Sequence, residues 1–204
     1  MTLADMAQDA TVAEEDVLRA NLYDLLSALL ANPPQRVLID RVADLEGDDG
    51  DLGRAVKALA RVARATTEQA AEREFSRLFI GVARGELLPY ASYYMTGFLN
   101  EKPLALLRND MTRLGIERAP NVFEPEDNIA SLCEMMAGLI LGRFAEAPVG
   151  LSAQKDFFSA HIAPWAGHFF ADLEAAKGSV FYAPVGAIGR AFIEIEREAF
   201  RMGA

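Results

Sequence analysis

The chain has 204 residues, 51% hydrophobic and 25% charged, which is the composition of a globular protein and excludes a disordered or low-complexity chain. Thirty Asp and Glu residues outnumber 20 Lys and Arg residues, and the net charge of −10 argues against nucleic acid or anionic lipid as a partner and favours a basic one. The single cysteine, Cys133, excludes an internal disulfide.

The N-terminus and the lengths of the apolar runs indicate in which cellular compartment the protein is expected. Several acidic residues precede the first basic residue, Arg19, which is the wrong charge order for a secretory signal. The longest purely apolar run, residues 135–142, is far shorter than the ~18 residues of a membrane span. We therefore expect a cytoplasmic protein without stable membrane association.

Apolar residues recur at spacings of three and four over 18–30, 38–45, 52–63 and 75–82, which predicts four helices in the first part of the chain. Thr11 and Glu14 form a capping-box pattern before the first helix, and Asn32-Pro33-Pro34 ends it. Thr66-Thr67 is a cap signal for the fourth helix. The acidic segment 46–51 is interpreted as a solvated turn.

The helical spacing fails between Gly81 and Tyr94, which predicts a loop that ends in a cluster of tyrosines. A helix is expected over 103–114, closed by Gly115, and a second loop over 116–124. A long buried helix is then expected over 129–144, with acidic residues at its start that complement the helix dipole.

Two further helices complete the chain. Ser152 is expected to cap a helix with apolar residues over 158–173, which Pro164 kinks or divides, and the last helix follows Pro184. Nowhere does a period of two persist. The sequence therefore predicts an all-α single-domain bundle of about eight to ten helices over 1–204, with 115–124 as a candidate hinge.

The sequence offers little for catalysis. His161 and His168 are the only histidines, and seven residues along one helix place them about 10.5 Å apart, too far to share a metal ion. Cys133 falls on the apolar face of its helix, as a buried structural cysteine does. We expect no catalytic residue, metal or cofactor.

Four segments together carry a resemblance. They are an aromatic-x-x-Leu-Phe element at 75–81, a Pro-Tyr-x-Ser element at 89–93, Glu-Pro-Glu-Asp at 124–130, and an aromatic helix at 158–170. In this order they resemble the TorD/DmsD family of cytoplasmic chaperones for molybdenum-cofactor enzymes. The resemblance implies an all-helical fold and a protein that binds the twin-arginine signal peptide or the core of a molybdoenzyme precursor until its cofactor is inserted. Where the family has a histidine, this chain has Asn128.

A twin-arginine leader presents two guanidinium groups and then an apolar segment, so its receptor needs an apolar groove with carboxylates at one end. Glu124, Glu126 and Asp127 are the candidate arginine partners. The full set of candidate client-binding residues is Tyr90, Ser92, Tyr93, Tyr94, Glu124, Glu126, Asp127, Asn128 and Trp165.

Two other functions stay open at this point. One is a small helical enzyme that uses Asp127 or His161 as a base, and the other is a structural adaptor whose apolar surface is buried in a symmetric interface. The sequence leaves open which reductase or dehydrogenase is the client and whether the chain is a monomer or a homodimer.

Overall fold

The computed structural model describes residues 12–82, 84–120, 122–145 and 147–203, and within these ranges it is all-α, as predicted. The ten α-helices are α1 (Glu14–Ala31), α2 (Arg36–Ala43), α3 (Asp51–Ala65), α4 (Glu68–Phe75), α5 (Ala91–Thr96), α6 (Lys102–Leu114), α7 (Ile129–Leu141), α8 (Leu151–Phe157), α9 (Ala166–Ala175) and α10 (Tyr182–Met202). Two π-helical turns, Ser76–Ile80 and Phe158–Ile162, extend α4 and α8. Within the described ranges, no helix has the length and apolar character that crossing a membrane requires.

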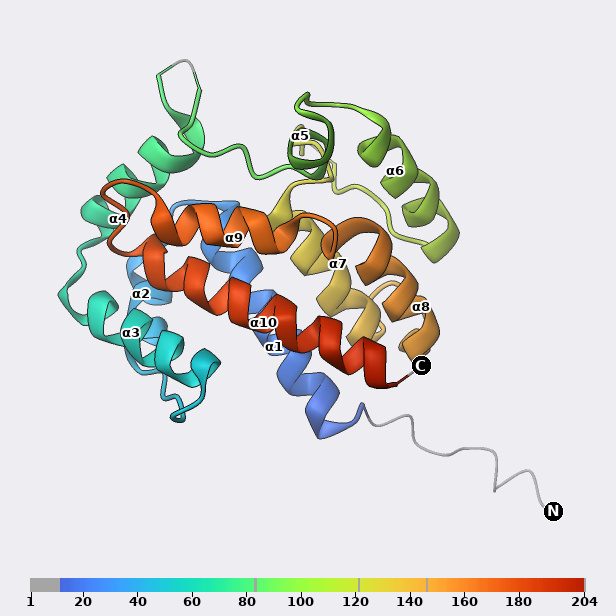
Figure 1. Ribbon diagram of the computed structural model, residues 1–204, viewed down its shortest axis with the longest axis horizontal. Coiled ribbons are helices and arrows are strands. Elements are labelled where there is room, and N and C mark those ends of the chain that lie inside the picture. Colours follow the sequence, from blue (N-terminus) through green and yellow to red (C-terminus); the bar gives the residue numbers. More distant parts are fainter. Residues whose placement is uncertain (1–11, 83, 121, 146, 204) are drawn as a thin grey trace.

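Segments far apart in the sequence form the centre of the bundle. Helix α1 packs along α7, and α10 packs along both α9 and α3, while α2 lies against α3 (Figure 1). Helices α5 and α6 lie together at one end of the molecule (Figure 1). The first helix, α1, and the last helix, α10, thus both belong to the centre of the bundle and contact each other.

The core is built from helices of different character. Helix α7 is apolar almost all round and buries ten of its 13 residues, which is the pattern of a central helix. Aromatic side chains on and next to α8, α9 and α10 belong to the same buried cluster as α7, and Trp165, Phe169 and Phe192 are each at most 1% exposed.

Several predicted boundaries hold. Thr67 caps α4 by accepting a hydrogen bond of 3.2 Å from the Ala70 backbone N–H. Gly115 ends α6 in the left-handed conformation, with φ of 70°. Pro164 falls between the π-turn that follows α8 and the start of α9, so it divides the predicted helix.

Other boundaries differ. The residue before α8 is Gly150, so Ser152 lies inside the helix and is not its cap. Helix α7 ends at Leu141 and not near Phe144, because Gly142 adopts a left-handed φ of 72°. Pro184 lies within the first turn of α10, where its missing N–H costs nothing. The proposed cap Thr11 lies outside the described residues.

The predicted loop 81–94 also needs correction, because its last part forms the short helix α5. Tyr93 and Tyr94 are therefore on a helix, and Tyr90 is the residue that precedes it. Six residues are too few for a helix to be stable by propensity alone, so α5 depends on contacts with the rest of the fold.

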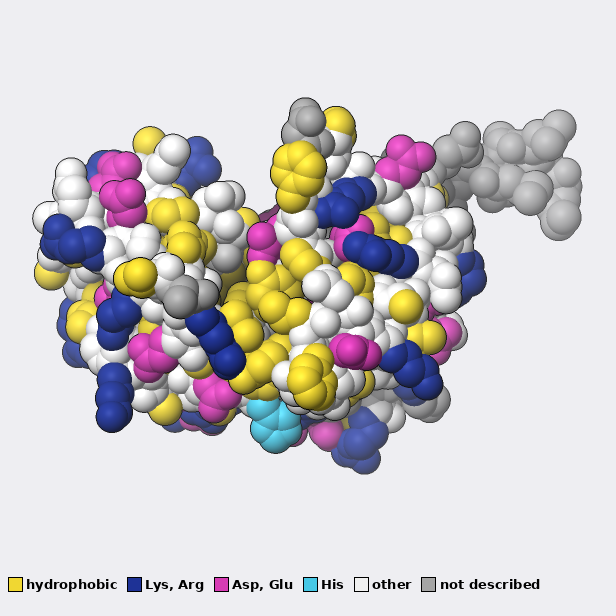
Figure 2. All heavy atoms as spheres, turned by 90° about the horizontal axis from the view of Figure 1, so that it is seen from above, with side chains coloured by type: hydrophobic (Ala, Val, Ile, Leu, Met, Phe, Trp, Pro, Cys, Tyr) yellow, Lys and Arg dark blue, Asp and Glu magenta, His cyan; other side chains and the backbone are white. Residues whose placement is uncertain are grey.

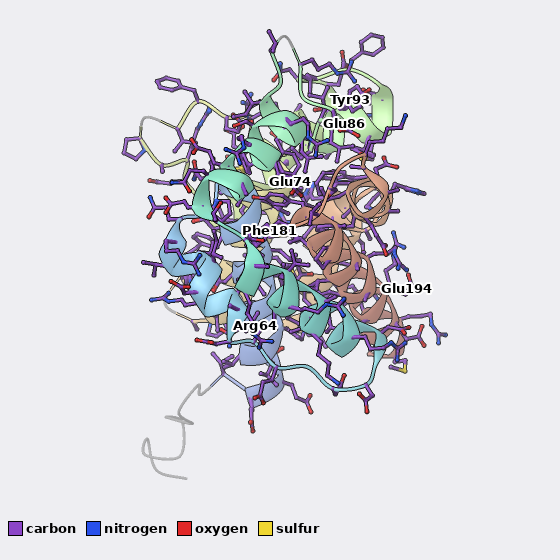
Figure 3. All side chains as sticks on the ribbon, turned by 90° about the vertical axis from the view of Figure 1, so that its left-hand side faces the viewer. Arg64, Glu74, Glu86, Tyr93, Phe181 and Glu194 are labelled. Carbon is purple, nitrogen blue, oxygen red and sulfur yellow. The ribbon has the colours of Figure 1, made fainter. Side chains whose placement is uncertain are left out.

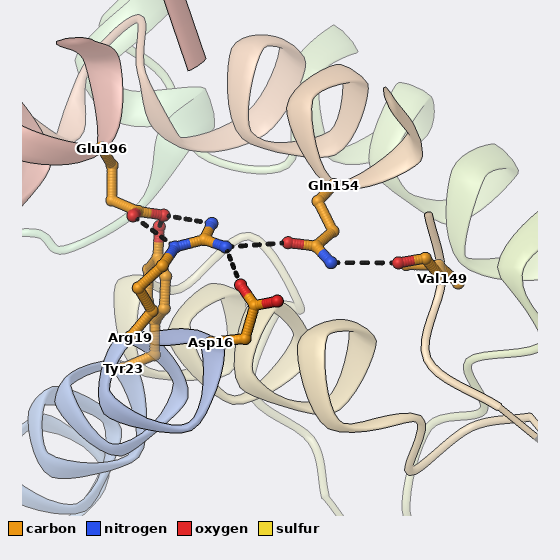
Figure 4. A network of polar contacts seen from close by, with 6 residues as sticks. All are labelled: Asp16, Arg19, Tyr23, Val149, Gln154 and Glu196. Atoms are coloured by element: carbon orange, nitrogen blue, oxygen red, sulfur yellow. Dashed lines mark hydrogen bonds and ion pairs between the residues drawn. The ribbon is translucent and has the colours of Figure 1, made fainter. Parts of the chain in front are cut away.

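A buried ion pair joins α1 to α10 (Figure 4). The Glu196 side chain is fully buried, and Arg19 donates to both of its carboxylate oxygens, at 2.7 and 2.9 Å. The Tyr23 hydroxyl also donates to Glu196, at 3.0 Å. Arg19 further donates to Asp16 and to Gln154 of α8, so one guanidinium links three helices.

We expect Arg19→Met to lower the free energy of unfolding by about 3 kcal/mol or more, because it leaves a buried carboxylate without its cation. Adding Glu196→Leu to Arg19→Met should recover much of the loss, since the remaining side chains are then both apolar. Urea unfolding followed by circular dichroism measures both. A single variant as stable as the wild type would contradict the assignment.

Candidate functional site

Two of the sequence motifs meet at one backbone bridge. Tyr90 and Asn128 form an isolated antiparallel bridge, in which the Ala91 N–H donates to the Asp127 carbonyl at 3.0 Å and the Ile129 N–H donates to the Pro89 carbonyl at 2.9 Å. The segment before α5 is thereby fixed to the segment before α7. The structure thus brings the predicted Pro-Tyr-x-Ser and Glu-Pro-Glu-Asp elements together.

Asp127 holds the start of α5. Its Oδ2 atom accepts a hydrogen bond from the Ser92 backbone N–H at 2.7 Å and another from the Ser92 hydroxyl. Both residues are at most 1% exposed. Asp127 therefore acts as a side-chain cap for a helix 35 positions away in sequence. Its Oδ1 atom is the one buried side-chain polar atom without a hydrogen-bond partner in the described part of the chain.

Glu126 faces two arginines of this same chain. Arg108 of α6 donates to its Oε2 atom at 2.9 and 3.1 Å, and Arg118 lies 3.5 Å from its Oε1 atom. Burial opposes the charged form, but the hydrogen bonds and the two positive charges outweigh it, so the pKa of Glu126 is lowered from its usual value of 4.5. Glu126 anchors α6 and the 116–124 loop to the bridge.

Glu124 is the exposed member of the three carboxylates. The Tyr90 hydroxyl donates to its Oε1 atom, and Arg118 donates to its backbone carbonyl at 2.9 Å. Partial desolvation raises the pKa of Glu124 above its usual value. Of the three predicted arginine partners, Glu124 alone presents its carboxylate to the outside, while Glu126 and Asp127 turn inward because the bridge places them beneath it.

The aromatic candidates also differ in burial. Trp165 is 1% exposed, and its indole N–H donates to the His161 carbonyl at 2.7 Å, so it is a core residue and has no face for a partner. Tyr94 is half-buried against Trp165 and Phe169, and its hydroxyl donates to Asp172 of α9 at 2.8 Å. The expectation that Trp165 lines a groove is therefore corrected.

Tyr93 is half-buried and lies under an arginine of the neighbouring loop. The Arg84 guanidinium carbon is 5.0 Å from the centre of the Tyr93 ring, and its Nη2 atom donates to the Tyr93 hydroxyl at 2.5 Å. Figure 3 shows Tyr93 at the same end of the molecule as Glu86 of that loop. The Arg84 guanidinium therefore covers one face of the Tyr93 ring as a cation–π pair.

Exposed apolar side chains are frequent on the segments around the bridge. They are Val82 on the 81–88 loop, Met95, Phe98 and Leu99 on and after α5, and Val122 and Phe123 just before Glu124. Figure 2 shows hydrophobic side chains over α5 and along the hollow that separates it from the lobe of α4 and the 81–88 loop. We take this apolar surface beside a carboxylate as the candidate interaction site.

The remaining polar candidates have structural partners. Asn128 caps α7 by accepting from the Ala130 backbone N–H at 2.9 Å. His161 is buried and lies 2.7 Å from Asp110 of α6. Cys133 is fully buried, and burial strongly raises the pKa of its thiol. Asp127 and His161, the two bases of the enzyme hypothesis, are thus each engaged in holding the fold.

Sequence reasoning missed the arginines. Arg84, Arg108 and Arg118 complete the site, yet each lies outside the motifs. Residues 84–118 carry about as many basic as acidic residues, so no local pattern indicates which carboxylate each arginine meets.

Comparisons with known proteins agree with these motifs. The sequence profile described as nitrate reductase delta subunit matches residues 45–171. A chaperone protein TorD from Vibrio cholerae serotype O1 (strain O395) is 29% identical, over 94% of this chain and 95% of its own. The chaperone protein TorD of Vibrio atlanticus is 26% identical, over 88% and 93%.

The fold is also shared with a solved structure. A redox enzyme maturation protein from Archaeoglobus fulgidus superimposes with a TM-score of 0.57 at 20% identity, over 87% of this chain and 94% of that one. At this identity the likeness concerns the fold alone.

The lowered pKa of Glu126 predicts a contribution to acid stability. Because the folded pKa lies below the unfolded one, the stabilisation is present above about pH 4.5 and is lost as pH falls through the folded pKa. We expect Glu126→Gln to be less stable than wild type by about 1–2 kcal/mol at pH 7, and the difference to shrink below pH 4. Urea midpoints measured from pH 7 to pH 3 test this, with the exposed Glu117→Gln as control. A difference that does not change with pH would contradict it.

Proposed function

We propose that this chain, which belongs to the nitrate reductase delta subunit family of TorD-type maturation chaperones, binds the twin-arginine signal peptide of a redox-enzyme precursor at the surface around Tyr90 and Glu124. A member of this family assists the maturation of a redox enzyme and catalyses no reaction of its own. The client we propose is a cytoplasmic precursor of a molybdenum-cofactor oxidoreductase, held by its leader or by its core until the cofactor is inserted.

The observation that carries the proposal is the exposed Glu124 carboxylate, fixed by Tyr90 beside a set of exposed apolar side chains. A guanidinium binds a carboxylate through two parallel hydrogen bonds, and a fixed carboxylate loses less conformational freedom on binding than a mobile one. The apolar segment of a leader can then cover Phe98 and Phe123, which are 69% and 88% exposed.

The inward carboxylates support this surface from below. Asp127 fixes α5, and Glu126 fixes α6 and the 116–124 loop. Two of the segments that carry exposed apolar residues, α5 and the 116–124 loop, are thus tied to one bridge. In this proposal Glu126 and Asp127 position the surface, and only Glu124 touches the arginines.

A surface this open supports modest affinity. Burying about four large apolar side chains contributes roughly 6–12 kcal/mol, and association costs about 4 kcal/mol or more. The complex should therefore have a Kd in the micromolar range at best, which suits a chaperone that must release its client.

Titration of a peptide with two arginines and a following apolar segment tests the proposal. We expect saturable binding by the wild type and an affinity about fivefold lower for Glu124→Gln, since a partly exposed ion pair contributes about 1 kcal/mol. A peptide with lysines in place of the arginines should also bind more weakly, because an ammonium cannot form both hydrogen bonds.

Two variants serve as controls. Glu117→Gln removes one exposed carboxylate from the same loop and should leave the affinity unchanged. Trp165→Phe should reduce stability but not affinity, because Trp165 is buried. Binding that Glu117→Gln and Glu124→Gln reduce equally, or no binding at high micromolar concentration, would refute the proposed surface.

The raised pKa of Glu124 predicts that peptide affinity decreases when the pH is lowered. A protonated Glu124 cannot pair with a guanidinium, so affinity should decrease as pH falls toward the raised pKa, beginning at a higher pH than an ordinary glutamate would give. An N-acetylated, amidated peptide without acidic residues has no group that titrates in this range. Titrations at pH 7, 6 and 5 should show the decrease for wild type and a nearly constant affinity for Glu124→Gln; a wild type as insensitive to pH as the variant would contradict it.

A further inference from the structure

A second groove lies away from the bridge, between α10 and the start of α3. It encloses about 1570 Å³, and none of its lining residues belongs to the surface around Tyr90 and Glu124. Its floor is apolar and is formed by Leu22 of α1, Leu52 and Val56 of α3, and Ala187, Ala191 and Ile195 of α10. Gly167 and His168 of α9 also line the groove.

The rim of this groove is anionic. Five carboxylates line it, against two arginines: Glu46, Asp48 and Asp51 at the loop and α3, and Glu194 and Glu198 on α10. Figure 3 shows Glu194 on α10, with α3 running beside that helix.

The two arginines of the rim are already engaged. Arg190 donates to Glu174 at 2.9 Å, and Arg197 donates to the Ala163 carbonyl and lies 3.4 Å from Glu194. Three of the five carboxylates are engaged as well, since Asp51 pairs with Arg54, Glu194 with Arg197 and Glu198 with Arg201. Only Glu46 and Asp48 of the rim form no ion pair with any residue that the structure describes. The groove therefore has negative charge to offer a partner.

Two glycines fix the acidic loop in place. A Cβ atom on Gly53 would lie 2.4 Å from the backbone nitrogen of Asp48, and one on Gly47 would lie 2.1 Å from the Gly53 carbonyl oxygen. The 46–50 loop therefore lies directly on the first turn of α3, at a distance that only glycine permits. The segment 46–51 is solvent-exposed, as interpreted from the sequence, and it also forms one wall of the groove.

The shape and charge of the groove select its occupant. It follows α10 from Ala187 to Met202, which is about 22 Å at 1.5 Å per residue, the length of a helix of about 15 residues. An apolar floor with an anionic rim complements a helix that is apolar on one face and cationic on the other.

The segment before α1 does not supply such a helix, and α3, which is cationic and amphipathic, is already one wall of the groove. The segment before α1 has no Lys or Arg and carries Asp5 and Asp9, so it has the same sign of charge as the rim. A second copy, with a net charge of −10, is also repelled. We propose that the groove between α3 and α10 binds a cationic amphipathic helix of a partner polypeptide, independently of the proposed signal-peptide surface.

The test uses the full chain and a synthetic 15-residue helical peptide of lysine and leucine. Met202→Cys places a fluorophore at the end of the groove, and the buried Cys133 does not compete for the label. We expect saturable binding that weakens with salt and is absent for the matched peptide of glutamate and leucine. The pair Glu46→Gln and Asp48→Asn should weaken binding about tenfold.

Two further variants locate the site. Glu15→Gln with Glu117→Gln removes the same charge from exposed positions outside the groove and should not change the affinity. Ala191→Trp fills the floor without changing the charge and should abolish binding, while its circular dichroism spectrum and urea midpoint show whether it is folded. Equal losses for the rim pair and the distant pair, or unchanged binding by folded Ala191→Trp, would overturn the proposal.

A second label keeps this outcome separate from that of the proposed function. Phe123→Cys, labelled in the same way, lies beside Glu124. The lysine–leucine peptide should change the signal at position 202 and not at 123, and a twin-arginine peptide the reverse. If both peptides change only the signal at 123, the groove proposal fails while the signal-peptide surface stands.

Discussion

The buried carboxylate of Glu196 constrains the whole bundle. Water cannot reach it, so the fold must supply a cation and hydrogen-bond donors, and α1 supplies both through Arg19 and Tyr23. This contact fixes the position of α1 along α10. Helix α7 packs on α1, and helices α3 and α9 pack on α10. The ion pair therefore helps to set the relative positions of most core helices.

The candidate surface also depends on buried carboxylates that the fold must supply with partners. Three carboxylates within four residues have three different roles, which depend on the direction in which the bridge turns each of them. Glu126 and Asp127 face inward and hold α6 and α5, and Glu124 faces outward, where a cation can reach it. Structural acids beneath the surface are what make a fixed carboxylate above it possible.

Helical periodicity predicted the all-α class and most helices, because amphipathic spacing is a local property. It missed α5, whose cap is the Asp127 side chain 35 residues away, a contact that no local pattern contains. For the same reason the motifs identified Glu126 and Trp165 as site residues but could not show their burial. Arg108, which pairs with Glu126, and Tyr94, which packs on Trp165, become neighbours of these residues only when the helices pack.

The placement of the only cysteine has a consequence for work beside immature redox enzymes. Cys133 is buried within α7, so its thiol is shielded from exchange with the thiols of an unfinished enzyme and from oxidation by its surroundings. A mixed disulfide with a client would require the bundle to open around α7, so in the folded chain this thiol takes no part in holding or releasing one.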